Sequence, residues 1–303
     1  HHPDSIAPVL VDSGIRGIIC GPTTSWPPSD TDENSGSVLK KLEGLLRSGP
    51  LDNGRVEYGI AAHSVYTCSE ETLLRASDLG KKYEEGLKKE NVHFFYTKKK
   101  EIIPTGTCLI LITPDSERTM VTFLGTAGKI NDNDIDASAV KNSEILFLEG
   151  YLWDEGEPKK AFEKAIKNSN KTAMSLSDKF CVDRHKLSFL NLVKSYLDIT
   201  FANEQEILSL IDAKNFEDVI TFGKSVGKLM VITRGEKGSI AIRGDDVVEY
   251  GILKNLNIVD LTGAGDLFAA GFLHGQINNL SLKESLQKGT EMSSKIIQKI
   301  GAR

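Results

Sequence analysis

The stretch DLTGAGDLFAAGF, residues 260–272, places two carboxylates around three small residues where a helix is expected to begin. The backbone N–H groups of Gly263, Ala264 and Gly265 would point out of the first turn, where the helix dipole also favours an anion. Small residues are needed there, because a bulky side chain would keep the backbone away from a phosphate. Asp266 lies in the same turn and could take a proton from a hydroxyl group. Donors and a base within one turn suit phosphoryl transfer, in which the protein mainly positions the reactants and stabilises charge.

A second interpretation of this stretch is a glycine-rich turn whose aspartates only cap the helix. The longer segment VDLTGAGDLFAAGFLHG, however, resembles the C-terminal signature of the PfkB-type sugar kinases, the ribokinase-like family. The family pattern is Asp-Thr-x-Gly-Ala-Gly-Asp, and Leu261 stands here in place of the Thr. The resemblance implies that Asp266 is the catalytic base and that the Gly263–Gly265 amides form an anion hole. It also places Asp260 near a bound monovalent cation, as a metal-site residue.

The tetrapeptide NEQE, which begins at Asn203, resembles the Asn-x-x-Glu of the same family. The resemblance implies that Asn203 and Glu206 help to order Mg²⁺ and the phosphates through water, with Glu206 at the metal site. From the residues alone, a helix N-cap formed by Asn203 together with a solvent-exposed Glu206 explains this segment equally well.

The segment TRGEKGS resembles the Thr-x-Gly-x-x-Gly turn of these kinases. The resemblance implies that Thr233, Arg234, Gly235 and Gly238 line the nucleotide site. An ordinary hairpin turn is the alternative for this segment.

Two further segments, TGTCLILITPDSERTM and FLEGYLWD, resemble the adenosine-kinase-like branch of the family. In that branch Arg118 would lie near the transferring phosphate, which makes it a predicted substrate-binding residue. A solvated Arg118 beside Glu117 is an equally good interpretation.

From about residue 105 onward, short apolar runs alternate with amphipathic segments. The runs suit strands buried on both faces, and they fall at 107–113, 144–150 and 228–235. Helical patterns fall at 157–169, 203–211, 216–228, 263–277 and 282–300. This rhythm predicts βαβ units, and therefore an α/β fold with a mostly parallel sheet flanked by helices. The ribokinase-like resemblance implies the same fold.

Composition narrows the class of protein. The net charge is −5 and the pI about 5.8, which argues against nucleic acid as the main partner. The four cysteines are far apart and form no CxxC pair, so that neither a zinc ribbon nor a disulfide framework is expected. No apolar run approaches the ~20 residues of a membrane helix. We expect a cytoplasmic protein without a membrane partner.

Residues 1–82 carry a different resemblance. DSGIRGIICGP and VEYGIAAHSVYTCSEETLLRASDLGKKY resemble metal-dependent amidohydrolases of the chlorohydrolase and deaminase group, which are TIM-barrel enzymes. His63 stands where such enzymes have a metal ligand at a strand end, but the other ligands are missing, and one His cannot hold a catalytic zinc. We therefore expect an amidohydrolase-like fragment over 1–82, resembling part of a TIM barrel, followed over 83–303 by the C-terminal part of a ribokinase-like kinase domain.

The predicted activity is ATP-dependent phosphorylation of a hydroxyl group on a sugar or nucleoside, with ATP and Mg²⁺ as cofactors. The chain contains no Gly-Gly dipeptide, although the family holds its sugar with one, so we expect the substrate-binding half to be missing. The alternatives are a metal-dependent amidohydrolase and a non-catalytic nucleotide-binding chimera. If residues 1–82 add no strand to the kinase sheet, its open hydrophobic edge predicts a homodimer or aggregation.

Overall fold

The structure is a computed structural model that describes residues 16–23, 56–62, 88–89, 91–93, 95, 107–112, 118–153 and 156–301. At 16–23, 56–62, 107–112 and 118 it describes the backbone but not the side chains. The chain divides into two compact units, His1–Ala127 and Gly128–Arg303, which are treated separately.

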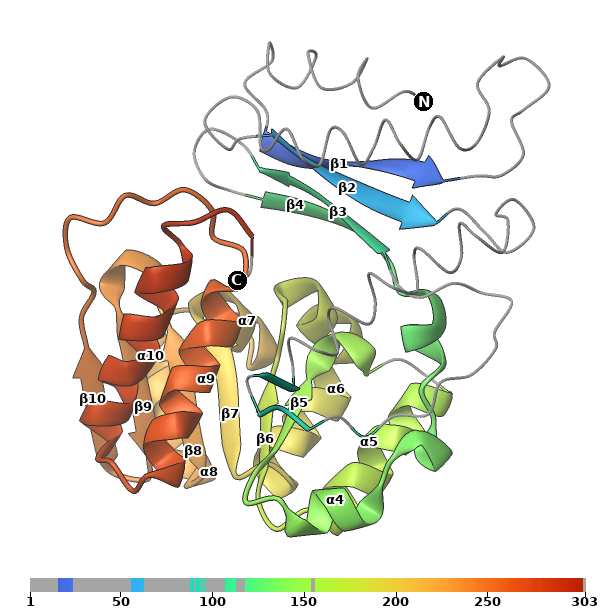
Figure 1. The fold of residues 1–303 in the computed structure, drawn as a ribbon. Coiled ribbons are helices and arrows are strands. Elements are labelled where there is room, and N and C mark those ends of the chain that lie inside the picture. Colours follow the sequence, from blue (N-terminus) through green and yellow to red (C-terminus); the bar gives the residue numbers. More distant parts are fainter. Residues whose placement is uncertain are drawn as a thin grey trace, which may run out of the picture. The chain divides into compact units, whose positions relative to one another are not determined.

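The first unit contains a four-stranded sheet with the order β2-β1-β3-β4. Its strands are β1 (Arg16–Thr23), β2 (Val56–Ala62), β3 (Thr107–Ile112) and β4 (Arg118–Phe123). Strand β1 runs parallel to β2 and antiparallel to β3, which in turn runs antiparallel to β4 (Figure 1). The sheet therefore combines strands from both sides of the predicted junction near residue 82. Its antiparallel pairs give no support to a TIM-barrel arrangement, in which all strands are parallel.

The second unit is built on a six-stranded sheet with the order β10-β9-β8-β7-β6-β5. The strands are β5 (Leu146–Glu149), β6 (Thr172–Ser175), β7 (Ile199–Asn203), β8 (Leu229–Thr233), β9 (Ser239–Arg243) and β10 (Asp246–Tyr250). The strands β5 to β8 run parallel, and β9 and β10 extend the sheet as antiparallel hairpins. The predicted α/β class with a mostly parallel sheet is confirmed.

The helices of this unit follow the predicted pattern, with ends set by local caps. They are α4 (Ala137–Asn142), α5 (Glu157–Asn168), α6 (Lys179–Ser195), α7 (Glu204–Leu210), α8 (Phe216–Val226), α9 (Ala264–Ile277) and α10 (Leu282–Ile296). Asn203, Asn215 and Ser281 each form a capping box at the start of α7, α8 and α10. Among the described residues, no helix has both the length and the apolar character to cross a bilayer.

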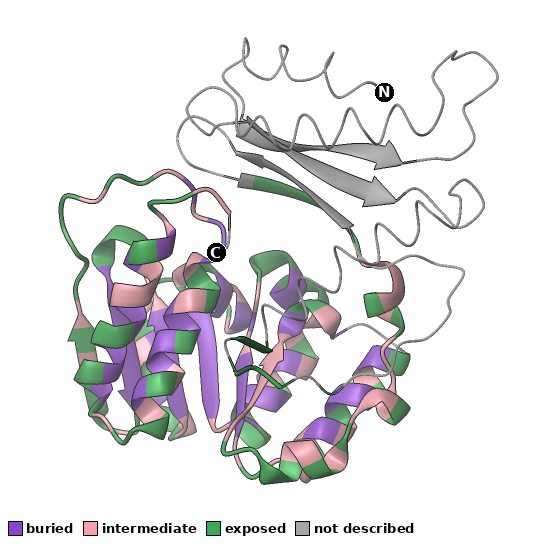
Figure 2. Cartoon of the chain, viewed as in Figure 1, coloured by how far each residue is buried: buried purple, intermediate pink, exposed green. Residues whose placement is uncertain are grey.

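Two hydrophobic clusters cover the two faces of the six-stranded sheet, because neighbours along a strand point to opposite faces. On β8, Leu229 and Val231 belong to the cluster that also contains Phe272 of α9. Met230 and Ile232 belong to the other cluster, which gathers side chains from α5 to α8. The unit thus has three layers, with α9 and α10 on one face and α5 to α8 on the other, and its central strands are the buried part in Figure 2.

Glycines let α9 and α10 approach each other closely. A Cβ atom on Gly271 would lie 2.5 Å from the backbone oxygen of Lys288, and one on Gly275 would lie 2.5 Å from Oγ of Ser285. From the other side, a Cβ on Gly289 would lie 2.8 Å from the backbone oxygen of Phe268. The small-residue run of α9 therefore packs this helix against α10, which holds the start of α9 in place.

Candidate active site

Most of the predicted site residues of the second unit gather at one edge of its sheet. Asn203 ends β7, Thr233 ends β8, and Glu149 ends β5. Parallel strands bring their carboxyl ends to the same edge, and open α/β sheets bind ligands there. The crossover that follows β10 returns the chain to this region as the start of α9 (Figure 1).

The start of α9 has the form of an anion site. Gly263 caps the helix with φ of 78°, a left-handed conformation that favours glycine. The Ala264 N–H donates within the turn, to the backbone oxygen of Leu261 over 3.2 Å. The N–H groups of Gly265 and Asp266 have no acceptor among the described residues, and both residues are exposed. Among the predicted amides, that of Ala264 is thus occupied and that of Gly265 is open. The amide of Asp266, which was not predicted, is open as well.

The space in front of this turn is also open. A Cβ atom added to Gly265 would meet nothing within 4 Å. Among the described residues, no side chain therefore covers the outer face of Gly265. The carboxylate of Asp266 lies in this first turn, so that the predicted base and the predicted donors are together.

Asp260 has a structural role that the sequence did not indicate. Its side chain is buried, with Oδ1 accepting the Thr262 N–H and Oδ2 accepting the Gly301 N–H, each over 2.8 Å. The N–H of Asp260 itself donates to the backbone oxygen of Ile297 over 3.2 Å. These bonds join the loop before α9 to the chain after α10. The hydroxyl of Thr262 is buried, and no described residue hydrogen-bonds to it.

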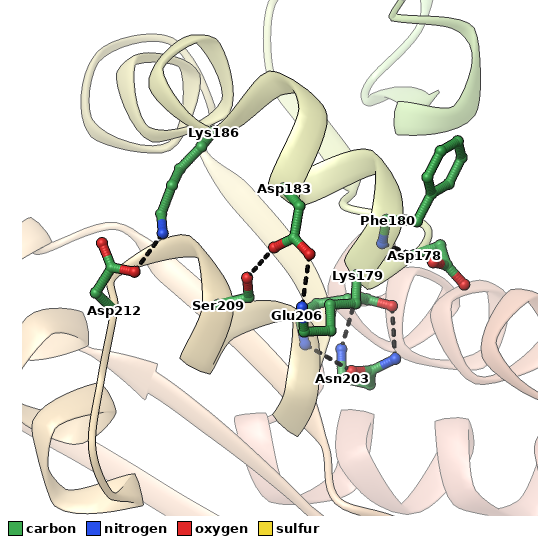
Figure 3. A network of polar contacts seen from close by, with 9 residues as sticks. All are labelled: Asp178, Lys179, Phe180, Asp183, Lys186, Asn203, Glu206, Ser209 and Asp212. Carbon is green, nitrogen blue, oxygen red and sulfur yellow. Dashed lines mark hydrogen bonds and ion pairs between the residues drawn. The ribbon is translucent and has the colours of Figure 1, made fainter.

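Asn203 and Glu206 form a closed pair at the start of α7 (Figure 3). The Asn203 N–H donates to Oε2 of Glu206 over 2.9 Å, its side-chain Nδ2 donates to Oε1 over 2.6 Å, and the Glu206 N–H returns a bond to Oδ1 over 2.8 Å. The N-cap alternative is thus correct in its geometry, but Glu206 is only 4% exposed and not solvated. Burial raises the pKa of Glu206 to about 7, against the hydrogen bonds from Asn203, and the charges of Asp178 and Glu149 add to the rise.

Glu149 is a site residue that sequence reasoning did not single out. Burial raises its pKa to about 7, the hydrogen bond from Ser177 opposes this, and the nearby charge of Asp266 adds to it. Oε2 of Glu149 accepts the Ser177 hydroxyl over 2.9 Å, and that hydroxyl in turn accepts the Tyr151 N–H over 3.2 Å. Ser177 has φ of 70°, a strained conformation for a residue other than glycine. The available signal was a glutamate at the end of an apolar run, in FLEG.

A polar network fastens α6 to α7 behind the Asn203–Glu206 pair (Figure 3). Asp183 on α6 accepts the hydroxyl of Ser209 on α7 and pairs with Lys179 over 2.5 Å. Lys186 of α6 pairs with Asp212, just past the end of α7, over 2.5 Å. These contacts join α6 to the C-terminal end of α7 and not to its first turn.

The predicted nucleotide turn connects β8 to β9 as a tight hairpin. Thr233 and Ser239 are opposite each other in the antiparallel ladder, and the Arg234 N–H donates to the backbone oxygen of Gly238 over 2.8 Å. Gly238 has φ of 84°, and a Cβ there would lie 2.2 Å from the backbone oxygen of Tyr250. The hairpin alternative thus describes the backbone, and glycine is required at 238. Gly235 also has a positive φ, of 56°, with open space around it.

The structure does not describe the side chains of two predicted residues. Arg118 begins β4 in the first unit, where its backbone is described but its side chain is not. His63 is not among the described residues. Within the described part of the chain, no group of three or more His, Cys, Asp or Glu side chains could hold a metal ion by itself.

Known proteins resemble the chain in sequence and in fold. Adenosine kinase of Dictyostelium discoideum is 27% identical to the chain over 218 residues, which is 66% of this chain and 64% of that enzyme. The chain thus spans less than two thirds of the length of this curated relative.

Solved structures resemble the chain over most of its length. Adenosine kinase from Sinorhizobium meliloti aligns with a TM-score of 0.72 and 30% identity, over 98% of this chain and 90% of that one. A protein assigned as ribokinase II from E. coli, solved in complex with ATP and Mg²⁺, aligns with a TM-score of 0.67 and 17% identity, over 95% of this chain and 92% of that one. The fold is therefore ribokinase-like, whereas these alignments provide no support for an amidohydrolase-like segment. Residues 74–303 match the family described as pfkB family carbohydrate kinase, and the chain belongs to that family.

Proposed function

We propose that the chain transfers the γ-phosphoryl group of ATP to a hydroxyl group of a sugar or nucleoside. The observation that carries this proposal is the start of α9, where the open N–H groups of Gly265 and Asp266 and the Asp266 carboxylate share one exposed turn. Family membership supports the reaction class.

Each residue then has a distinct part in the reaction. The Asp266 carboxylate accepts the proton of the acceptor hydroxyl as that oxygen attacks phosphorus. The N–H groups in the first turn of α9, with Gly263 setting the backbone for them, stabilise negative charge on the moving phosphoryl group. The turn containing Thr233, Gly235 and Gly238 lines the nucleotide. Arg118 remains a proposed substrate-binding residue on its resemblance to the adenosine-kinase-like branch alone.

Mg²⁺ fits the oxygen donors at this edge of the sheet. Glu206 is buried and Glu149 is partly buried. Desolvation raises the pKa of both carboxyl groups, and the charge of Glu149 adds to the rise at Glu206. Mg²⁺ in nucleotide sites is held by one or two carboxylates together with phosphates and water, which agrees with the lack of a self-sufficient metal cluster among the described residues. When bound, Mg²⁺ supplies charge stabilisation at the phosphates. A monovalent cation beside Asp260 is a separate proposal, in which the cation would share carboxylate oxygens that already accept the Thr262 and Gly301 N–H groups.

The first test is calorimetry of ATP binding with Mg²⁺, comparing the chain with Gly265→Val and Asp266→Asn. We expect binding to be lost in Gly265→Val, whose side chain would fill the open space in front of the donors, and kept in Asp266→Asn. No binding to the unaltered chain would overturn the kinase proposal and favour the non-catalytic alternative.

The second test is turnover. Adenosine is the first acceptor to try, because both the Dictyostelium and the Sinorhizobium relatives are adenosine kinases, and simple sugars follow. The transfer rate should fall by about 10²–10⁴-fold in Asp266→Asn, which binds ATP but has lost the base. An unaltered rate in that variant would remove Asp266 from the mechanism.

We retain a separate proposal for the N-terminal part: residues 1–82 derive from an amidohydrolase, and the kinase part begins near residue 83 without its sugar-binding half. The support for this proposal is the resemblance of the sequence around His63 to amidohydrolases. The match to the kinase family begins at residue 74, before the proposed junction near residue 83. Metal analysis of the purified chain tests the hydrolase alternative, since stoichiometric zinc or iron would favour it. Light scattering tests the predicted homodimer, which a monomer at high concentration would contradict.

A further inference from the structure

Two cations of the β8–β9 turn hold the same carboxylate on α7. Nε of Arg234 donates to Oε2 of Glu204 over 3.0 Å, and Nζ of Lys237 donates to Oε1 over 3.1 Å. Glu204 is the first residue of α7, directly after the N-cap Asn203. Burial would raise the pKa of Glu204, but the hydrogen bonds from Lys237 and Arg234 outweigh it and lower that pKa below its ordinary value. The carboxylate is therefore charged, and the same turn occupies both of its oxygens.

The remaining surface of the Arg234 side chain is also engaged. Its guanidinium carbon lies 3.7 Å from the centroid of the Phe216 ring, at the start of α8. Nη1 lies 3.9 Å from a carboxylate oxygen of Glu249 on β10. The side chain is only 17% exposed. Stacking on a ring while donating from an edge is a geometry that a guanidinium can adopt and an ammonium cannot.

We infer that Arg234 is a positioning residue, which fixes the 233–238 turn against the first turn of α7. We call the contact between Arg234 and Glu204 the Arg234–Glu204 tie. Glu204 lies between Asn203 and Glu206 in sequence, so this tie sets the distance between the turn and the Asn203–Glu206 pair. The effect on nucleotide binding rests on the proposed kinase function. Arg234 supports the nucleotide site through Glu204 and Phe216 and is not itself a ligand of the phosphates.

Nucleotide binding separates a positioning residue from a ligand. Calorimetry with Mg²⁺ and ATP would compare Arg234→Gln, Glu204→Gln, the double variant and Arg234→Lys. If Arg234 acts by position, each single glutamine variant weakens binding about tenfold. The double variant then loses less than the sum of the two single losses, because both variants remove the Arg234–Glu204 contact. Arg234→Lys, which keeps the charge but loses the stacking, should restore less than half of the loss in free energy.

The opposite result is equally clear. If Arg234 binds phosphate directly, Glu204→Gln frees the guanidinium, so binding stays unchanged or strengthens, and the inference is overturned. The matched control is Lys186→Gln, which breaks the Lys186–Asp212 pair on the far side of α7 and should leave the affinity unaltered.

Hydrogen exchange tests the tie without any nucleotide. The N–H groups of Lys237 and Gly238 donate within the turn, to the backbone oxygens of Arg234 and Gly235 over 3.1 and 3.0 Å. These two amides should exchange about tenfold faster in Arg234→Gln and in Glu204→Gln than in the unaltered chain or Lys186→Gln. Unchanged exchange in variants that melt cooperatively would overturn the inference. If the unaltered chain binds no ATP but the two glutamine variants still show faster exchange, the kinase proposal is wrong and the positioning role of Arg234 is supported.

Discussion

The carboxylate of Asp260 binds the backbone of Gly301, 41 residues further along the chain, through a 2.8 Å hydrogen bond from the Gly301 N–H. Its other oxygen accepts the Thr262 N–H, at the entrance to α9. One buried side chain thus connects the loop that presents the proposed anion site to the segment that follows α10.

Asp260→Ala should lower the free energy of unfolding by about 3 kcal/mol, because it removes a charged acceptor and leaves N–H groups without partners in a buried place. Urea unfolding measures the change. Asp246→Ala, at an exposed position of β10, is the matched control and should change the stability by less than about 0.5 kcal/mol. Equal losses in the two variants would contradict a structural part for Asp260.

Two substitutions of the same kind on α9 should have separate effects. Gly265→Val projects into open space at the start of the helix and should abolish nucleotide binding with little loss of stability. Ala270→Val places the same isopropyl side chain at an exposed position of the helix and should leave binding unaltered. Calorimetry and thermal unfolding of both variants check this, and a Gly265→Val chain that still binds ATP would show that the anion lies elsewhere.

Glycine-to-alanine substitutions at two positions of α9 should change the free energy of unfolding in opposite directions. Gly265→Ala should raise the free energy of unfolding by about 0.5 kcal/mol, since the new methyl group meets nothing and the unfolded chain loses freedom. Gly271→Ala should lower it by about 1–3 kcal/mol, because its Cβ would lie 2.5 Å from the Lys288 backbone oxygen. Urea unfolding of the pair tests the packing of α9 on α10, and two changes of the same sign would count against it.

The raised pKa values predict how stability varies with pH. Glu149 and Glu206 both have a pKa raised from 4.5 to about 7. Between these values the folded chain binds more protons than the unfolded chain, so the free energy of unfolding should fall as the pH rises through that interval. Glu149→Gln should remove about 1 kcal/mol of this fall in urea unfolding with EDTA present. The same slope in the variant would show that the Glu149 carboxyl titrates normally.

Mg²⁺ binding should show the opposite trend, because the cation needs the deprotonated carboxylates. Calorimetry should find tighter binding of Mg²⁺ with ATP as the pH rises from about 6 to about 8, with part of the increase absent in Glu206→Gln. Identical pH profiles for the variant and the unaltered chain would exclude Glu206 from the metal's surroundings.

Local signals predicted much of the fold. Apolar runs located β5 and β8, and the asparagine before an acidic residue located the start of α7. The same signals could not assign Glu149, because its surroundings depend on β6 lying beside β5 and on α9 starting more than a hundred residues later. Local signals also suggested that Glu206 is exposed to solvent, although it is buried. Its burial depends on how the sheet and helices pack together, which the sequence of one helix turn does not indicate.

Arg234 shows the same limit at a single side chain. Its place in TRGEKGS predicted the turn correctly, but its partner Glu204 lies 30 residues earlier, on a different element. The pairing of Arg234 with Glu204 depends on the order of the strands in the sheet. Residue spacing within a single segment cannot predict it.

The glycine contacts between α9 and α10 have a consequence for how such a chain can change over generations. Almost any substitution at Gly271, Gly275 or Gly289 would force the two helices apart, because a Cβ atom at each position would lie within 2.8 Å of an atom of the other helix. We therefore expect these three positions to vary little among descendants of this chain, while Gly265, whose Cβ position is open, is free of this packing constraint. The two helices would then be inherited as one unit.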